Sequence, residues 1–223
     1  MKICLTTGGD GSMRERESLA LRGLAEYAEQ HGYCYHQAVF KPDPERAVQF
    51  SKLTTLLELL DMPDYDWLVW LDSDCVITAP ERPLDKIIET WSTPATNCIV
   101  AQDWHGMCTC VVMLRNCEWS RQFLECCLFM GTMNIDSSEQ DQSCFKFFHK
   151  FTPKHIWRFS LLPTDVVADQ TIVPIPRPWV WHLSMGKDTV TCMQHALAGV
   201  AAGKFEQGFV NWPRMKHGIV YKV

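Results

Sequence analysis

The sequence lacks long apolar runs and blocks of one charge. No stretch approaches the roughly 20 apolar residues of a membrane span, and the apolar start of the chain is too short for a signal peptide. Lys and Arg form no block, and 26 acidic residues against 21 basic ones give a net charge of −5, which argues against a nucleic-acid partner. We therefore expect a cytoplasmic chain with no integral membrane segment, unless an anchor lies outside it.

Cys-x-x-Cys pairs are also missing, although the chain has 11 cysteines. Cys108 and Cys110 are one residue apart, which in a strand would put both on one face, and Cys126 and Cys127 are adjacent. Neither spacing builds a four-ligand zinc site. We interpret the cysteines as reduced core residues of a protein in a reducing compartment.

What the sequence does contain is an alternation of strand and helix patterns. Its 223 residues, 47% of them apolar, suffice for one good-sized domain. The first half predicts, in order, a strand at 3–7, a helix at 13–30, a strand at 33–40, a helix at 51–60 and a strand at 67–71. This order is typical of a nucleotide-binding half-fold with a parallel sheet. Beyond it we predict a helix at 83–91, strands at 98–102 and 109–114, a helix with Asn116 as its N-cap, a helix opening at 139–142, a strand near 179–182 and a last helix at 189–202.

The chain is organised around residues 66–76, DWLVWLDSDCV. The run 67–71 has no polar alternation, so we expect a strand buried on both faces. Asp72 and Asp74 follow directly, and two carboxylates at the end of a buried strand are costly unless a cation lies between them. Open α/β sheets bind ligands at that end of a strand. A divalent metal beside a phosphate compound is one interpretation, and an acidic turn in water is the other.

Other polar groups also stand where a predicted strand ends or a helix begins. These are the glycine-rich turn at 8–11, Asp141, His182 and Lys187. Each alone has an ordinary structural explanation: a turn glycine, a helix-dipole partner, a core histidine. Together, two carboxylates, one imidazole and diphosphate oxygens would suit Mn²⁺. Mg²⁺ is the alternative ion, although it prefers all-oxygen shells.

Six short motifs in the right order resemble a known family over nearly the whole chain. They are AEYAEQHGY at 25–33, FSKLTTL at 50–56, YDWLVWLDSDCVITAP at 65–80, VVMLRNCEWSRQFL at 111–124, EQDQS at 139–143 and WHLSMGK at 181–187. The order is similar to that of GT-A glycosyltransferases, and within that fold to the galactosyl/mannosyl/xylosyltransferase family of fungi and plants (family 34). The resemblance implies an α/β fold with a Rossmann-like, mainly parallel central sheet flanked by helices.

The resemblance also implies a reaction and residue roles. A sugar would pass from a nucleoside-diphosphate sugar, most simply a UDP-sugar, to a glycan or other hydroxyl acceptor with retention at the anomeric carbon. By the family pattern, the metal ligands are Asp72, Asp74 and His182; the donor contacts are Thr6, Thr7, Gly8, Lys52, Asp72, Ser73, Gly186 and Lys187; and the groups at the anomeric centre or acceptor are Asp141 and Gln142. Residues 1–103 would form the nucleotide-sugar half and 104–223 the acceptor half of a single domain.

The sequence departs from the family pattern before the Arg-Asn strand. The usual Asn-Ala/Thr-Gly stretch, which borders the donor sugar, reads Met107-Cys108-Thr109-Cys110 here. We also expect no counterpart of the family's Golgi anchor and stem in this chain. Exposed-looking tryptophans beyond residue 103, namely Trp104, Trp157 and Trp212, could stack on sugar rings. Two other functions stay open. A sugar nucleotidyltransferase would use a glycine-rich loop with Arg14 and Arg16, and a non-catalytic module would bind the nucleotide sugar or glycan without turnover.

Overall fold

The main sheet has six strands and carries every strand predicted in the first half of the chain. In a computed structural model, the structure describes residues 1–11, 14–41, 43–62, 64–103, 106–133, 140–163, 166–169, 179–182, 193–194, 197–198 and 200–201. The sheet order is β2-β1-β3-β6-β5-β7. The bounds are β1 Ile3–Gly9, β2 Cys34–Val39, β3 Trp67–Leu71, β5 Cys98–Asp103, β6 Gly106–Arg115 and β7 Phe159–Leu162.

The sheet is mixed, although most of its pairings are parallel. Strand β1 pairs in parallel with β2 and β3, and β5 pairs in parallel with β7. Strand β6 runs antiparallel to both β3 and β5. Strand β3 is therefore parallel to β1 and antiparallel to β6. Its fully buried run had suggested parallel neighbours on both sides. The mainly parallel, helix-flanked sheet predicted from the sequence is confirmed.

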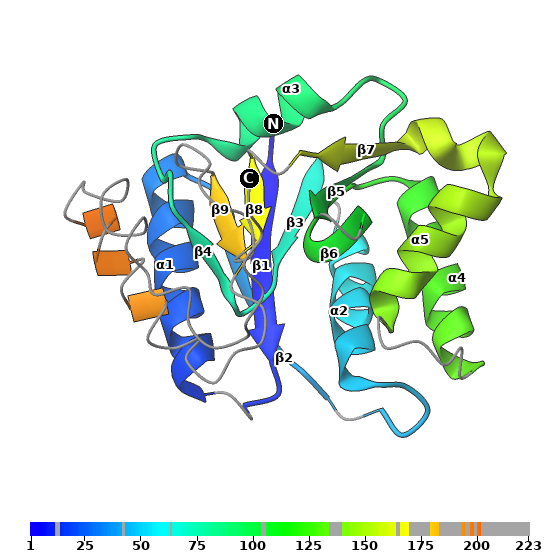
Figure 1. Cartoon of the computed structure of the whole chain (residues 1–223), viewed down its shortest axis with the longest axis horizontal. Coiled ribbons are helices and arrows are strands. Elements are labelled where there is room, and N and C mark those ends of the chain that lie inside the picture. The colour runs from blue at the N-terminus through cyan, green and yellow to red at the C-terminus, as the bar shows by residue number, and fades with distance from the viewer. Residues whose placement is uncertain are drawn as a thin grey trace, which may run out of the picture.

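Helices cover both faces of this sheet (Figure 1). Helix α1 lies on one side, and α2, α4 and α5 lie together on the other. Helix α3 packs near one end of the strands. Their bounds are α1 Arg14–His31, α2 Ser51–Leu60, α3 Leu84–Trp91, α4 Glu118–Thr132 and α5 Asp141–Phe151, with 3₁₀ turns η1 at Val48–Phe50 and η2 at Pro153–Arg158.

A second, three-stranded sheet lies on the α1 side, and its order is β4-β9-β8. Its strands are only three residues long: β4 Cys75–Ile77, β8 Val167–Asp169 and β9 Val180–His182. Strand β4 follows β3 after a single turn, and β9 comes from near the end of the described chain. This sheet therefore carries a late segment to the carboxyl end of β3.

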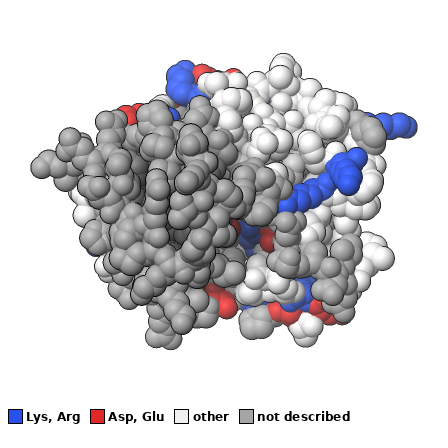
Figure 2. All heavy atoms as spheres, viewed as in Figure 1, with Lys and Arg blue, Asp and Glu red and all other residues white. Residues whose placement is uncertain are grey.

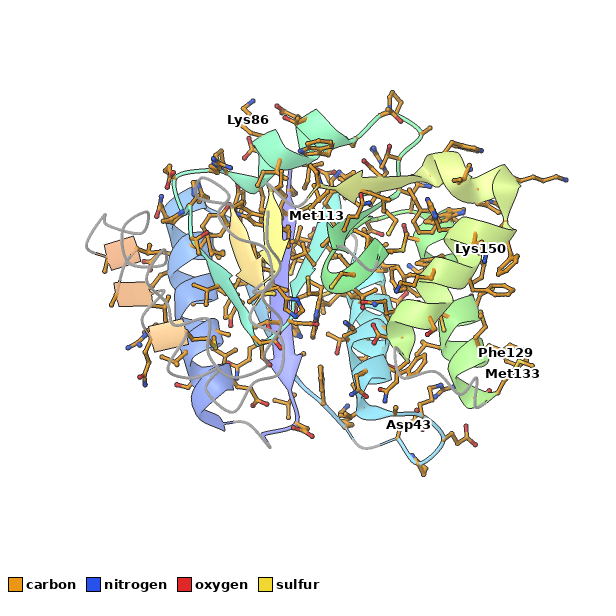
Figure 3. The ribbon with its side chains drawn as sticks, viewed as in Figure 1. Asp43, Lys86, Met113, Phe129, Met133 and Lys150 are labelled. Atoms are coloured by element: carbon orange, nitrogen blue, oxygen red, sulfur yellow. The ribbon has the colours of Figure 1, made fainter. Side chains whose placement is uncertain are left out.

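The buried strands divide their side chains between two hydrophobic cores. Trp67, Val69 and Leu71 of β3 pack with α1 and the small sheet, whereas Leu68 and Trp70 pack with α2, α4 and α5. This alternation follows from the two-residue period of a strand. All five residues are buried, which confirms the prediction of a strand covered on both faces. Strand β6 also contributes to both cores, but its alternation is interrupted where Cys110 and Val111 both face the α1 side, next to the register shift of its pairing with β5. Figure 3 shows Met113 of β6 in the middle of the molecule.

One local prediction about a helix end was wrong. Helix α4 begins at Glu118 with Cys117 as its N-cap, and no side chain makes the capping hydrogen bond. Asn116, the predicted cap, instead donates its amide to the Met62 carbonyl at 3.1 Å. A tertiary contact has thus taken the side chain that the local pattern assigned to the helix end.

The described surface carries charges of both signs. On the face seen in Figure 2, the charged side chains of the described residues are scattered among uncharged ones. Phe129, near the end of α4, and Met133, which caps that helix, are exposed (Figure 3). Of the described helices, none has the length and apolar character needed to cross a membrane.

Candidate active site

Asp72 and Asp74 lie in the turn that joins β3 to β4. The Asp72 N–H donates to the Cys110 carbonyl at 2.9 Å, and the Cys75 N–H donates to the Asp72 carbonyl at 2.9 Å. The first bond ties the turn to β6, and the second closes it. Ser73 and Asp74 are buried and Asp72 is half-buried. The carboxylates therefore stand at the carboxyl end of a buried strand, as the sequence predicted.

Strand β9 brings His182 to these carboxylates. In the β4–β9 ladder, Cys75 is the direct partner of His182. His182 Nε2 lies 3.5 Å from Asp74 Oδ1. One ligand atom each from Asp72, Asp74 and His182 falls within a mutual distance of 4.8 Å. The three residues predicted as metal ligands are thus adjacent, and two carboxylate oxygens with one imidazole form a donor set that fits Mn²⁺.

A buried lysine joins Asp72 to Asp141. Lys52 Nζ lies 3.2 Å from Asp72 Oδ1 and 3.0 Å from Asp141 Oδ2. The Trp70 indole N–H donates to the same Asp72 oxygen at 2.6 Å. One oxygen of Asp72 is therefore held by two donors, which fixes the orientation of the carboxylate. The donor contact predicted for Lys52 stays a prediction; its described contacts are to the protein.

Thr109 of β6 completes this buried group. Its hydroxyl donates to Asp141 Oδ2 at 2.9 Å, and its carbonyl accepts from Lys52 Nζ at 3.0 Å. Its backbone N–H donates to Gln142 Oε1 at 3.1 Å. The first two residues of α5, Asp141 and Gln142, thus hydrogen-bond to β6. They are the two residues predicted to face the anomeric centre or the acceptor. The network of Lys52, Asp72, Thr109 and Asp141 was not predicted, because nothing local in the sequence links these positions.

Burial and charge oppose each other in this network. Burial acts against the charge of Lys52, but the carboxylates of Asp141 and Asp72 outweigh it and raise the Lys52 pKa. Burial raises the pKa of Asp141, and the ammonium of Lys52 offsets only part of that effect. Lys52 therefore stays protonated, and its ammonium favours the charged form of Asp141 against the effect of burial.

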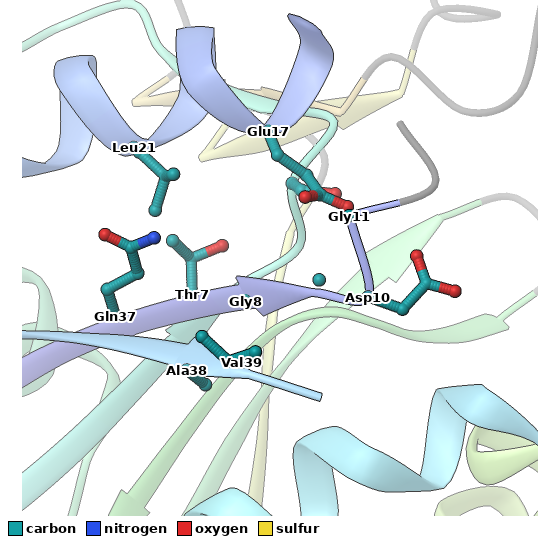
Figure 4. A pocket seen from close by; sticks show the side chains of 11 residues that line it. Thr7, Gly8, Asp10, Gly11, Glu17, Leu21, Gln37, Ala38 and Val39 are labelled. Atoms are coloured by element: carbon teal, nitrogen blue, oxygen red, sulfur yellow. The ribbon is translucent and has the colours of Figure 1, made fainter. Parts of the chain in front are cut away.

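A pocket opens beside the turn of Asp72 and Asp74 (Figure 4). Its empty volume is about 480 Å³, and its lining residues are Thr7, Gly8, Gly9, Asp10, Gly11, Glu17, Leu21, Gln37, Ala38, Val39 and Ser73. The predicted donor residues Thr7, Gly8 and Ser73 are among them. Thr6 is not, because its fully buried side chain lies on the opposite face of β1. Within the described structure the buried Thr7 hydroxyl has no hydrogen-bond partner, so a ligand group could supply one.

Three buried thiols lie behind the carboxylates. The Cys75 thiol donates to the Cys110 carbonyl at 3.6 Å. A second possible metal-ligand group consists of Cys108, Cys110 and His182, again with ligand atoms within 4.8 Å of one another. The ten described cysteines are free, and most are buried, in keeping with the predicted reduced core. The sequence did not reveal that His182 would join the Cys108–Cys110 pair.

Some predicted residues lie outside the described part of the chain. Gly186, Lys187, Trp104 and Trp212 are among them, so their roles stay predictions. Trp157 of η2 is described and is 49% exposed, as expected for a surface that could stack on a sugar ring.

The chain is similar in sequence to plant glycosyltransferases. Residues 17–92 match the galactosyl transferase GMA12/MNN10 family. Galactomannan galactosyltransferase 1 of Cyamopsis tetragonoloba is 26% identical over 147 residues, which is 58% of this chain and 33% of that protein. A probable xyloglucan 6-xylosyltransferase 1 of Oryza sativa subsp. indica is 30% identical over 123 residues, 50% of this chain and 26% of that protein. The chain spans about a quarter to a third of the length of such plant relatives.

Solved structures share the fold. A glycosyltransferase involved in the glycosylation of the major capsid of PBCV-1 superimposes with a TM-score of 0.74 at 15% identity, covering 87% of this chain and 99% of that one. The galactosyltransferase LgtC, solved with donor and acceptor sugar analogues, gives a TM-score of 0.58 at 11% identity, covering 89% of this chain and 95% of that one. The family resemblance and the GT-A fold predicted from the sequence are thus confirmed.

Proposed function

We propose that this chain is a metal-dependent glycosyltransferase that moves a sugar from a UDP-sugar to a hydroxyl acceptor with retention of anomeric configuration. One observation carries the proposal: Asp72, Asp74 and His182 converge within 4.8 Å of one another, and Ser73 between the two carboxylates lines the neighbouring pocket. A metal and a nucleotide could therefore occupy adjoining positions. The similarity to glycosyltransferases supports the reaction class, and the family resemblance supplies the donor base and the retention.

The residues present fit a divalent ion. Asp72, Asp74 and His182 would hold it, and Mn²⁺ suits a mixed carboxylate–imidazole set better than Mg²⁺ does. When bound, such an ion would neutralise the diphosphate of the donor and of the leaving nucleotide. Gly186 and Lys187, predicted to hold the same diphosphate, would add a cation from the protein.

The protein's own residues would position the donor and the second carboxylate. Gly8 and Ser73 let the nucleotide approach β1 and the Asp72 turn closely, and the Thr7 hydroxyl offers an unused hydrogen bond. Lys52 pairs with both Asp72 and Asp141. It would therefore keep the carboxylate predicted to bind the metal next to the carboxylate predicted to face the anomeric carbon. Preorganised groups of this kind typically cost about 2.7–4 kcal/mol of transition-state stabilisation when deleted.

A thermal-shift panel tests the donor and the metal together. UDP, GDP, CMP and their sugar derivatives are each offered with Mn²⁺, with Mg²⁺ and with a chelator. A ligand at about 100 times its dissociation constant stabilises by roughly 2.7 kcal/mol, which raises the melting temperature of a chain this size by about 5–10 °C. We expect that rise with UDP and UDP-sugars in Mn²⁺, and its loss in chelator.

Variants and product analysis make the test specific. Asp74→Asn and His182→Ala should abolish the metal-dependent shift, whereas Asp64→Asn, in an exposed turn, should keep it. Release of UDP with an acceptor supports transfer, and NMR of the product reports the anomeric configuration. Pyrophosphate formation from a nucleoside triphosphate would point to a nucleotidyltransferase instead. Binding without any UDP release across an acceptor screen would point to a binding module.

A further inference from the structure

Strand β6 sends its side chains to two different sites. Thr109 faces Lys52 and Asp141 on the α2–α5 side of the sheet. Cys108 and Cys110, one residue to either side, belong to the core on the α1 side. The two thiols therefore share one face of a rigid strand, directly behind the carboxylate turn. Their spacing is fixed by the strand and does not depend on a loop.

His182 lies between these thiols and Asp74. Its Nε2 is 3.5 Å from Asp74 Oδ1, and one of its ring nitrogens lies within 4.8 Å of the thiol sulfurs of Cys108 and Cys110. Cys108 and Cys110 are 6% and 2% exposed, and His182 is half-buried. Two thiols and an imidazole this close together, and shielded from water, form a set of soft and borderline ligands.

We propose that Cys108, Cys110 and His182 form a binding site for a thiophilic divalent ion of the zinc class, separate from the oxygen-rich site of Asp72 and Asp74. Thiolate sulfur and imidazole nitrogen are the ligands that select Zn²⁺ and its relatives over Mn²⁺ and Mg²⁺. With three protein ligands, a tetrahedral ion keeps its fourth position for water or another small ligand.

The distances suit this coordination. Bond lengths of about 2.3 Å to sulfur and 2.0 Å to nitrogen in a tetrahedron separate the ligand atoms by about 3.5–4 Å. The three ligand atoms lie within 4.8 Å of one another, so small side-chain rotations would close the set. Binding converts two thiols to thiolates and releases their two protons to solvent. No electron transfer or further reactant is needed.

The shared histidine makes the two sites exclude each other. A neutral imidazole has one nitrogen lone pair, because its other nitrogen carries the proton. His182 can therefore serve either the thiol pair or the carboxylate pair at one time. A zinc-class ion on the thiols would withdraw His182 from the Mn²⁺ site and lower its affinity for Mn²⁺. This competition rests on the proposed function, whereas binding at the thiols does not.

Cobalt binding tests the thiol site directly. Co²⁺ replaces Zn²⁺ in such sites and gives an intense near-ultraviolet thiolate-to-cobalt absorption. We expect that absorption when Co²⁺ is added to the full chain kept reduced by a phosphine, and its loss on addition of Zn²⁺. In the same unmodified protein, Zn²⁺ should protect Cys108 and Cys110 from a maleimide under mild denaturation, as read by peptide mass spectrometry.

Variants assign the ligands. Cys108→Ser and Cys110→Ser should each weaken Zn²⁺ binding by at least about 10–100-fold, the loss typical even of an outer partner of a metal ligand. Cys98→Ser is the matched control, because Cys98 is equally buried but belongs to the other core. Circular dichroism verifies folding. Free Mn²⁺, followed by electron paramagnetic resonance, should rise at a lower Zn²⁺ concentration in the unmodified protein than in Cys108→Ser, where Zn²⁺ can compete only at the carboxylate site itself.

The outcomes separate this proposal from the proposed function. No thiolate absorption with Co²⁺ together with no maleimide protection would overturn the thiol site, whatever Mn²⁺ does. The same absorption in a Cys108→Ser/Cys110→Ser double variant would overturn the ligand assignment. Thiolate absorption in a protein that never binds Mn²⁺ would uphold the thiol site and reject the Asp72–Asp74–His182 assignment. Simultaneous full binding of both ions would overturn the exclusion.

Discussion

Lys52 Nζ lies 3.0 Å from Asp141 Oδ2, and both side chains are almost completely buried. Lys52 lies in α2 and Asp141 is the first residue of α5. This ion pair therefore connects two helices that cover the same face of the sheet. Asp72 approaches the same ammonium from β3. A single cation thus compensates two carboxylates drawn from distant parts of the chain.

Replacing Lys52 by Met should destabilise the fold strongly. The substitution keeps the apolar stem but leaves Asp141 buried without its cation, and loss of one partner from a buried pair typically costs about 3–5 kcal/mol. Urea unfolding at neutral pH measures this as a lower midpoint. Lys86→Met is the control, because Lys86 pairs with Glu89 on an exposed helix surface and its removal should leave the midpoint unchanged. Equal midpoints for Lys52→Met and the unmodified protein would contradict the role given to Lys52.

The acid titration of Asp141 should make stability fall as pH rises. Burial raises the Asp141 pKa in the folded state above the unfolded value of about 3.9, despite the opposing effect of Lys52. The folded protein therefore holds a proton that the unfolded chain has lost, so the stabilisation present below about pH 3.9 disappears as pH rises through the folded pKa. Urea unfolding between about pH 4 and 7 tests this. The quantity to follow is the free energy of unfolding of the unmodified protein minus that of Asp141→Asn, which should decrease as pH rises. An increase would show that Lys52 affects the Asp141 pKa more than burial does.

The sequence predicted those features that depend on local periodicity. The leucine pattern located α2 at 51–60, and the buried run located β3 at 67–71. The carboxylates at the end of β3 followed from the position of Asp72 and Asp74. The apolar run before His182 predicted a strand near 179–182, and β9 lies there. A three-residue strand has no usable period, so the sequence did not show how β4, β8 and β9 pair in the small sheet.

Pairings between distant segments could not be predicted from the sequence. Nothing local indicates that β6 runs antiparallel to β3, because a buried strand has the same pattern in either direction. The contacts of Thr109 with Lys52 and Asp141, and the proximity of Cys108 to His182, all involve residues of β6. The Asn116 cap failed for the same reason, since a distant carbonyl competes for its side chain.

Thr109→Val should weaken the network without changing its shape. The variant removes the hydroxyl that donates to Asp141 Oδ2 at 2.9 Å and replaces it with a methyl group of similar size. A buried carboxylate that loses one donor typically costs about 1–3 kcal/mol. Urea midpoints measure the loss, and Thr54→Val on the exposed face of α2 should change stability by no more than about 0.5 kcal/mol. Equal losses of stability in both variants would mean that the change from threonine to valine, and not the lost hydrogen bond, lowers the urea midpoint.

Alanine at Gly8 and at Gly23 should change stability in opposite directions. A Cβ on Gly8 would lie 2.7 Å from both the Cβ and the carbonyl oxygen of Ala38, so β1 and β2 would have to separate. Overpacking of this kind typically costs about 1–3 kcal/mol. A Cβ on Gly23, inside α1, would meet Leu197 at an ordinary 3.5 Å. Alanine there should stabilise the helix by roughly 0.5–1 kcal/mol.

The same pair of variants tests the pocket. Gly8 lines it and Gly23 does not, so Gly8→Ala should reduce or abolish the melting-temperature rise caused by UDP and Mn²⁺, whereas Gly23→Ala should keep it. Differential scanning fluorimetry measures both effects in one experiment, with the unliganded melting temperatures reporting stability. If Gly8→Ala binds UDP as the unmodified protein does, the nucleotide lies away from the end of β1, since the strand separation that alanine requires there would reshape the pocket wall formed by Gly8 and Ala38.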